Sequence, residues 1–122
     1  MKLADWEKEL AEVMPFVKEV RRKLHRHPEV GGEERWTREF LEETLHGFGL
    51  KTTRFEDTCC VMTIIEGTRP GKCVAIRADI DALPIQEETG LPFASEIPGR
   101  MHACGHDAHM ALALGTAKYL SS

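Results

Sequence analysis

The stretch Cys60–Ala78, which reads CVMTIIEGTRPGKCVAIRA, indicates the fold class. Its two ends, residues 60–65 and 72–78, are short, rich in β-branched residues and almost continuously apolar, and a turn-rich segment joins them. Such runs, bounded by glycine and proline, are typical of strands. Continuous apolar strands between helices suggest a sheet that is covered on both faces. The stretch therefore predicts an α/β fold.

Three helices are expected around a mixed sheet of three to four strands, in which the polar-rich segment 50–55 forms an edge. The first helix has apolar residues at steps of three and four over residues 3–24. Pro15 predicts a kink, or a break near Met14, because a proline lacks the amide hydrogen that the helix interior needs. The helix is expected to end at Pro28, since the residue before a proline avoids the helical region.

The second helix is expected from about Glu33 to His46, with acidic residues at its start. The third is expected from Ala108 to Leu120, with Asp107 as its N-cap. Before it, residues 79–101 show little periodicity and predict a long loop. Long loops in compact domains are usually either functional or disordered.

Composition excludes several classes of protein. With 122 residues the chain has the length of about one domain. No apolar run approaches the roughly 20 residues of a membrane-spanning helix, and the net charge of −4 argues against nucleic-acid binding. The start of the chain lacks an apolar signal core, so a cytoplasmic protein is expected. The four cysteines form no Cys-x-x-Cys pair and are expected to be free thiols.

The first cluster that could support chemistry is Met101–His109, which reads MHACGHDAH. Cys104 and His106 can turn toward one ion, because Gly105 between them permits unusual backbone angles. A thiolate and an imidazole together favour zinc and related transition metals over magnesium or calcium. A polar loop, in which the histidines serve solubility or capping, is the alternative that this motif alone leaves open.

A second cluster, Asp79 and Asp81, directly follows the predicted strand 72–78. Functional carboxylates in α/β folds often lie at the carboxyl ends of strands. The alternative is that both aspartates are turn residues that accept hydrogen bonds from loop amides.

Taken together, the clusters give the chain a resemblance to the N-terminal part of the dinuclear-metal amidohydrolase branch of the aminoacylase/carboxypeptidase-type metallopeptidases. That group contains hippurate hydrolases, auxin-conjugate hydrolases and N-acetyldiaminopimelate deacetylases. The resemblance covers the chain nearly end to end, in the family's order and spacing. It rests on Arg22–His25, Pro28–Gly31, Glu34, Thr37, Pro70–Gly71, Arg77–Pro84, Thr89–Ala94 and Pro98–Asp107.

The resemblance implies a partial three-layer, zinc-exopeptidase-like catalytic domain over residues 1–122, without the lid domain through which relatives form homodimers. It implies that Cys104 and His106 bind metal and that Asp79 is catalytic. Supporting roles fall to Asp81, Gly105, Asp107 and His109. A complete site holds two divalent ions (zinc, manganese, cobalt or nickel), which activate a water that attacks the amide of an N-acylated amino acid or small peptide.

Residues that the family's site needs are absent from this sequence. No histidine follows His109 and no acidic residue follows Asp107, so the family's Glu-Glu pair and its two later histidine ligands are missing. A site with two protein ligands binds zinc poorly, and loss of a general base lowers the rate by about 10²- to 10⁴-fold. The chain by itself is expected to bind metal weakly or not at all and to be inactive.

Two other functions stay open. A stand-alone metal- or thiol-binding module could use Cys104, His102, His106 and His109. The chain could also be an inert, truncated scaffold. His25 and His27 resemble an element of the family at the end of the first helix, and their simplest interpretation is structural or solvated histidine.

Overall fold

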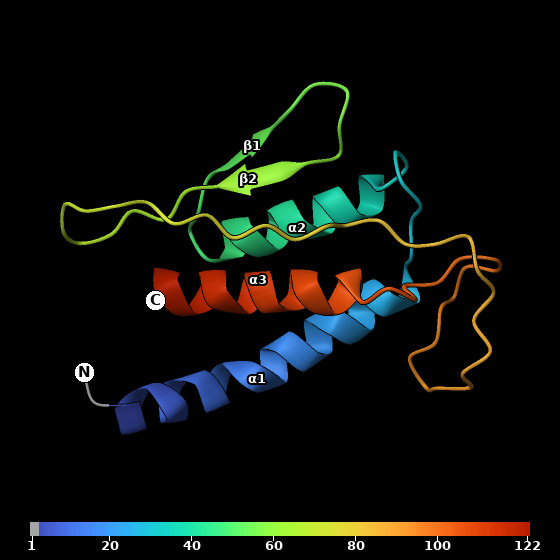
Figure 1. Cartoon of the computed structure of the whole chain (residues 1–122), viewed down its shortest axis with the longest axis horizontal. Coiled ribbons are helices and arrows are strands. Elements are labelled where there is room, and N and C mark those ends of the chain that lie inside the picture. The colour runs from blue at the N-terminus through green and yellow to red at the C-terminus, as the bar shows by residue number, and fades with distance from the viewer. Residues whose placement is uncertain (1–2) are drawn as a thin grey trace.

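The structure is a computed structural model, and it describes residues 3–122. In Figure 1, the last helix lies between the first helix on one side and the second helix with a strand hairpin on the other. The elements are α1 (Leu3–Arg26), α2 (Arg35–Gly47), β1 (Thr52–Arg54), β2 (Val61–Thr63) and α3 (His106–Ser121). Three helices and an α/β fold class are as predicted.

The first helix, α1, buries only the C-terminal part of the apolar stripe that its sequence predicted, since Trp6 and Leu10 are 49% and 48% exposed. Val17, Val20 and Leu24 are buried, and the helix ends at Arg26, just before His27-Pro28. The helix continues through Pro15, so no break occurs at Met14. Tertiary packing of the amphipathic face supplies most of a helix's stability in a protein, and it holds the turns on both sides of the proline together.

The core lies where α3 packs against α1 and α2. The Cβ of an alanine at Gly115 would lie 2.5 Å from Val17 Cγ2, so the glycine permits the close approach of α3 to α1. Each large apolar side chain buried here stabilises the fold by about 1.5–3 kcal/mol. The buried core cluster consists of Val17, Val20, Leu24, Leu41, Leu45, Met110, Ala111, Leu114 and Ala117.

A carboxylate from outside the helix caps the start of α2. The Glu29 carboxylate accepts hydrogen bonds from the backbone N–H groups of Trp36 (3.2 Å) and Thr37 (2.6 Å) and from the Thr37 hydroxyl (2.6 Å). A negative charge at this position also interacts favourably with the helix dipole. Glu34 turns back to the Gly32 amide instead, and the helix begins at Arg35, two residues after the expected start.

The sheet has two antiparallel strands, β1 and β2, paired with Thr52 opposite Thr63. The expected mixed sheet of three to four strands is therefore wrong in its strand count. Residues 72–78 form no strand, and Val74 and Ile76 are 85% and 64% exposed. A strand needs a neighbour for its N–H and C=O groups, and within residues 3–122 no segment pairs with this one.

Residues 79–101 form the expected long loop, pinned at its base by two isolated bridges. Ala82 pairs with Val30 in parallel, and Leu83 pairs with Met101 in antiparallel fashion. The second bridge brings the Asp79–Asp81 segment beside the histidine-rich motif. Among the helices of residues 3–122, none is long and apolar enough to cross a membrane.

Candidate metal centre

His106 is the centre of the site, and Asp81 fixes the orientation of its ring. Nδ1 of His106 lies 2.9 Å from the Asp81 carbonyl oxygen and 3.0 Å from Asp81 Oδ1. Both neighbours are acceptors, so Nδ1 is the nitrogen that donates a hydrogen, and in the neutral ring this leaves the lone pair on Nε2. A histidine whose second nitrogen is held by a carbonyl or carboxylate in this way is typical of metal sites.

Asp79 faces the other nitrogen of the same ring. Its Oδ2 lies 3.8 Å from His106 Nε2, and its Oδ1 lies 2.5 Å from the exposed guanidinium of Arg77. The Asp79 side chain is 40% exposed and that of His106 is 18% exposed. The structure therefore brings Asp79, Asp81 and His106 together, from the two clusters that the sequence singled out.

Cys104 and Gly105 form the turn that leads into α3. Gly105 has φ 101°, a left-handed conformation that glycine adopts readily, and it occupies the N-cap position of the helix. Cys104 is exposed and is a free thiol. A thiol and an imidazole suit zinc or a similar metal, but residues 3–122 contain no group of three or more potential ligands arranged around one ion. The donor types fit the expected metal, while their number does not complete a site.

Asp107 does not cap α3, which corrects the expected role. The helix begins one residue earlier than Asp107, and the Asp107 side chain turns inward and is fully buried. Its Oδ2 accepts from Arg21 Nε at 2.9 Å and lies 2.8 Å from His25 Nδ1. The tertiary ion pair with α1 draws the carboxylate away from the free amides of its own helix.

His102 and His109 flank His106 in the sequence and differ in burial. His102 is 3% exposed, and neither ring nitrogen has a hydrogen-bond partner. Burial lowers the pKa of His102 below its usual value, and the nearby His25 and His106 lower it further, against the opposing charge of Asp107. His109 is an exposed helix-face residue, with its ring 6.0 Å from that of His106.

The four residues of the stand-alone module therefore do not assemble. His102 is buried whereas Cys104 and His109 are exposed, and no ligand group forms from these side chains within the described part of the chain.

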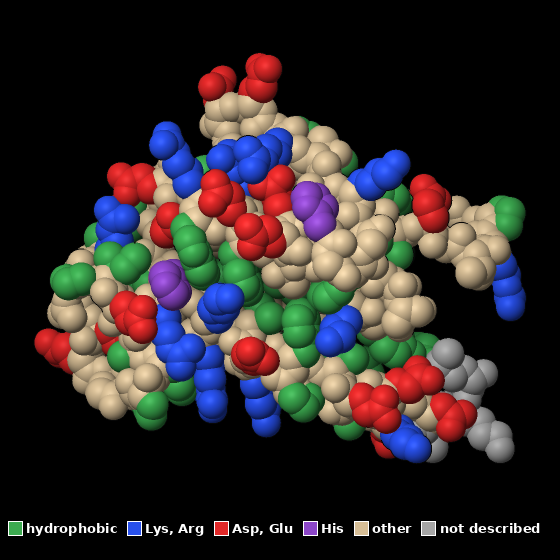
Figure 2. Space-filling view, turned by 180° about the vertical axis from the view of Figure 1, so that it is seen from behind, with side chains coloured by type: hydrophobic (Ala, Val, Ile, Leu, Met, Phe, Trp, Pro, Cys, Tyr) green, Lys and Arg blue, Asp and Glu red, His purple; other side chains and the backbone are tan. Residues whose placement is uncertain are grey.

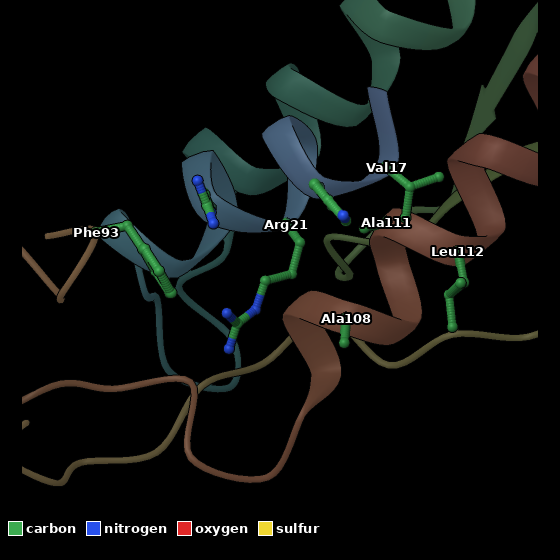
Figure 3. A pocket seen from close by; sticks show the side chains of 8 residues that line it. Val17, Arg21, Phe93, Ala108, Ala111 and Leu112 are labelled. Carbon is green, nitrogen blue, oxygen red and sulfur yellow. The ribbon is translucent and has the colours of Figure 1, made fainter. Parts of the chain in front are cut away.

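An apolar groove of about 320 Å³ lies between α1 and α3, and it does not include Asp79, Cys104 or His106. Figure 3 shows Arg21 reaching across it toward the start of α3. The Phe93 ring lies 5.0 Å and 4.9 Å from the guanidinium carbons of Arg21 and Arg22, at cation–π distance. The labelled residues along the groove are Val17, Arg21, Phe93, Ala108, Ala111 and Leu112.

Sequence reasoning missed a second polar cluster, formed by Arg21, His25, Glu87 and Asp107. Arg21 and His25 are four residues apart, on the same face of α1 as the buried Val17 and Leu24. A histidine and an arginine on the apolar face of a helix are a signal that could have been noticed, because buried polar groups need partners.

The family comparison places the site in a known group. Residues 75–122 match the sequence model of peptidase family M20/M25/M40. The chain is 56% identical over 102 residues to an N-acyl-L-amino acid amidohydrolase of Geobacillus stearothermophilus, covering 83% of this chain and 27% of that protein. It is 44% identical over 107 residues to an N-acetyldiaminopimelate deacetylase of Limosilactobacillus reuteri, covering 84% and 28%.

A solved structure agrees with these relatives. The YXEP protein of Bacillus subtilis, described as a dinuclear metal binding peptidase from the M20 family, superposes with a TM-score of 0.81 at 40% identity, over 94% of this chain and 31% of that one. The chain spans a little over a quarter of the length of the two curated relatives above. The segment that matches peptidase family M20/M25/M40, residues 75–122, contains Asp79, Cys104 and His106.

Proposed function

We propose that the chain is part of the catalytic domain of a metal-dependent amidohydrolase that cleaves the amide bond of N-acylated amino acids or small peptides. The observation that carries the proposal is the geometry of His106, whose Nδ1 is held by Asp81 and whose Nε2 faces Asp79. The similarity to an N-acyl-L-amino acid amidohydrolase supports the reaction class.

Each residue of the site has a proposed role. Cys104 and His106 would bind metal, and Asp81 orients the His106 ring so that Nε2 carries the lone pair. Asp79 would act beside the metal, where its carboxylate orients a ligand or balances the charge of the site. Zinc, manganese, cobalt or nickel, when bound, would supply the acidity that activates a water and polarises the amide carbonyl.

The proposed site is incomplete within these 122 residues. The chain has no histidine after His109 and no acidic residue after Asp107, so it lacks a general base and the remaining ligands that the family resemblance implies. We expect the chain alone to bind metal weakly and to show no hydrolysis.

We propose a cytoplasmic location and a small-molecule substrate. In Figure 2, acidic and basic side chains are interspersed on the face shown, without a patch of one sign that would favour nucleic acid.

A chimera tests the activity. Residues 1–122 would replace the matching segment of the Geobacillus stearothermophilus amidohydrolase, and hydrolysis of N-acetyl amino acids would be measured with added zinc or manganese. We expect the chimera to be active and its kcat to fall by about 10²-fold or more on Cys104→Ser, His106→Gln or Asp79→Asn. Cys73→Ser, at an exposed cysteine outside the site, is the control. Full activity of the three site variants would contradict the proposal.

The isolated chain gives a second test. The same assay with the 122-residue chain should show no turnover. Turnover with added zinc or manganese that Cys104→Ser abolishes would show that the two-ligand site suffices, against the expectation from the ligand count.

A further inference from the structure

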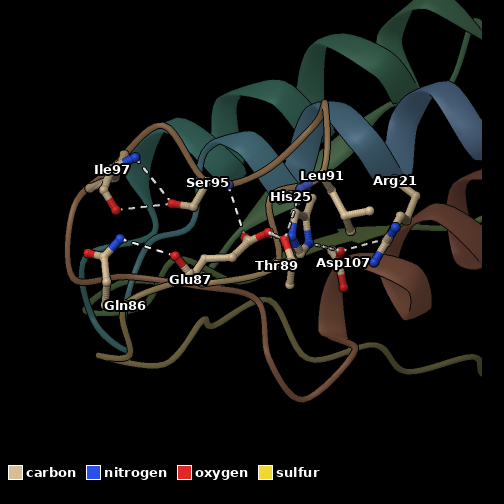
Figure 4. Close-up of polar contacts among 9 residues, drawn as sticks. All are labelled: Arg21, His25, Gln86, Glu87, Thr89, Leu91, Ser95, Ile97 and Asp107. Atoms are coloured by element: carbon tan, nitrogen blue, oxygen red, sulfur yellow. Dashed lines mark hydrogen bonds and ion pairs between the residues drawn. The ribbon is translucent and has the colours of Figure 1, made fainter.

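The cluster that sequence reasoning missed joins three segments that are far apart in the chain. His25 of α1 is 2% exposed; its Nδ1 lies 2.8 Å from Asp107 Oδ2, and its Nε2 lies 2.8 Å from Glu87 Oε1. Asp107 is on the first turn of α3, and Glu87 is in the loop 79–101. Figure 4 shows the imidazole between the two carboxylates, with Arg21 on the far side of Asp107.

The four side chains form a balanced and nearly closed set of charges. An imidazole that carries a hydrogen on each nitrogen donates to both carboxylates, and Arg21 donates to Asp107 as well. Two positive groups then face two negative ones. Hydrogen bonds of this kind, between charged groups, are the strong ones, and in a low-dielectric interior they hold their members firmly. Among these four side chains, Asp107 Oδ1 is the buried atom that has no hydrogen-bond partner.

Glu87 carries the network into the loop. It accepts hydrogen bonds from the Ser95 amide (3.0 Å) and from the Thr89 hydroxyl. Burial raises the pKa of Glu87, but these hydrogen bonds and the charge of His25 outweigh that effect, and the pKa lies below its usual value. Glu87 is therefore ionised at neutral pH and fastens the loop to His25.

Asp107 carries the network into the metal motif. The residue directly before it is His106, and Cys104 lies three positions back. The helix α3 consists mainly of alanine, leucine and other small or apolar residues, so hydrophobic packing alone specifies its rotation weakly. The hydrogen bonds to Asp107 supply a directional contact that sets which way the first turn of α3 faces.

From this geometry we infer that His25, held between Asp107 and Glu87, is a positioning residue that aims the metal ligands His106 and Cys104. The inference rests on the proposed metal site. In this proposal His25 touches neither metal nor substrate; it acts through Asp107 on the first turn of α3 and through Glu87 on the loop 79–101.

The first test measures the His106 ring without metal. In the 122-residue chain, NMR would follow the ring N–H hydrogen that His106 Nδ1 shares with Asp81. We expect His25→Gln to shift this resonance or to lose it to solvent exchange, in a protein whose circular dichroism still shows the fold. The matched control is His27→Gln, two residues away, where the ring is partly exposed and contacts the Lys23 carbonyl. An unchanged resonance in folded His25→Gln protein would overturn the inference.

The second test measures the metal site. Co²⁺ would be titrated into the chain, and thiolate-to-cobalt absorption would report binding at Cys104. We expect His25→Gln to weaken Co²⁺ binding by about tenfold or more, as the loss of outer partners does at metal sites, with no change for His27→Gln. Binding unchanged in folded His25→Gln protein, with only thermal stability reduced, would assign the cluster a purely structural role.

Two further variants keep the outcomes distinct. If His25→Gln does not fold, Glu87→Gln removes the charge from the loop side while keeping its shape, and the same two signals are expected to change. If wild-type absorption does not depend on Cys104, so that Cys104→Ser leaves it unaltered, the proposed metal site fails, and the NMR signal of His106 still decides the role of His25.

Discussion

His25 and His106 each lie beside two carboxyl-bearing residues, but only one of the two arrangements is closed. Both nitrogens of His25 are 2.8 Å from a carboxylate oxygen, and the ring is almost entirely buried. In His106, Nδ1 is bonded to Asp81, whereas Nε2 is 3.8 Å from the half-exposed Asp79. The closed arrangement leaves no nitrogen for a ligand and serves to hold segments in place. The open arrangement leaves Nε2 of His106 available to bind a metal ion.

The largest expected effect is on the free energy of unfolding, and it differs between the two carboxylates that hold these rings, Asp107 and Asp81. Asp107→Ala removes the acceptor shared by the partly exposed Arg21 and the buried His25 and leaves both groups without it. We expect a loss of about 3–5 kcal/mol in the free energy of unfolding, measured with urea. Asp81→Ala, its counterpart in the open arrangement, should cost about 1 kcal/mol or less, since the Asp81 backbone carbonyl still accepts from His106. Equal losses would remove the distinction between the two arrangements.

The next effect concerns the pH dependence of the closed arrangement. Because the pKa of Glu87 is lowered in the folded protein, its contribution to stability is complete above the usual glutamate pKa and is lost as the pH falls through the lowered value. Glu87→Gln should cost about 1.5–3 kcal/mol near pH 7. Urea unfolding from pH 7 down to pH 3 should show the gap between wild type and variant closing in acid. A difference in stability that does not change with pH would contradict the contribution of an ionised Glu87.

The smallest effect concerns His102, the buried histidine between the two arrangements. Burial lowers the pKa of His102 in the folded protein. The unfolded chain therefore binds a proton at this residue more readily than the folded chain does. As a result, the free energy of unfolding falls as the pH drops below the usual histidine pKa. His102→Leu removes two buried nitrogens that lack partners. We expect stability within about 1 kcal/mol of wild type at neutral pH.

The pH profile of His102→Leu distinguishes this residue from its neighbours. The variant should lose less stability than wild type between pH 7 and pH 5, in the same urea series. His27→Leu, at a partly exposed histidine, serves as the control and should keep the wild-type profile. The same acid sensitivity in both variants would assign the effect to another group.

Local signals predicted where the helices end, whereas the roles of the site residues stay a prediction. Pro28 correctly placed the end of α1, because a proline restricts the residue before it whatever the rest of the chain does. The low periodicity of residues 79–101 predicted the loop before α3, and Asp79 lies beside His106. These features depend on neighbouring residues or on a motif of a few positions.

Features that need distant partners were mispredicted or missed. Residues 72–78 have the composition of a strand, but pairing depends on another segment, and none within residues 3–122 supplies it. Asp107 has the position of an N-cap, yet Arg21 and His25 of α1 bind its carboxylate. The link between His25 and Glu87 spans 62 residues, and no local pattern reports such a contact.

The sequence by itself determined where the helices form and which residue types could bind a metal, because proline, glycine, apolar spacing and a cysteine–histidine motif act over a few residues. Only the tertiary structure decided which histidine is saturated by carboxylates and which has a nitrogen to offer. That difference depends on contacts between α1, the long loop and α3, whose hydrogen-bond geometry exists only once the three segments pack together.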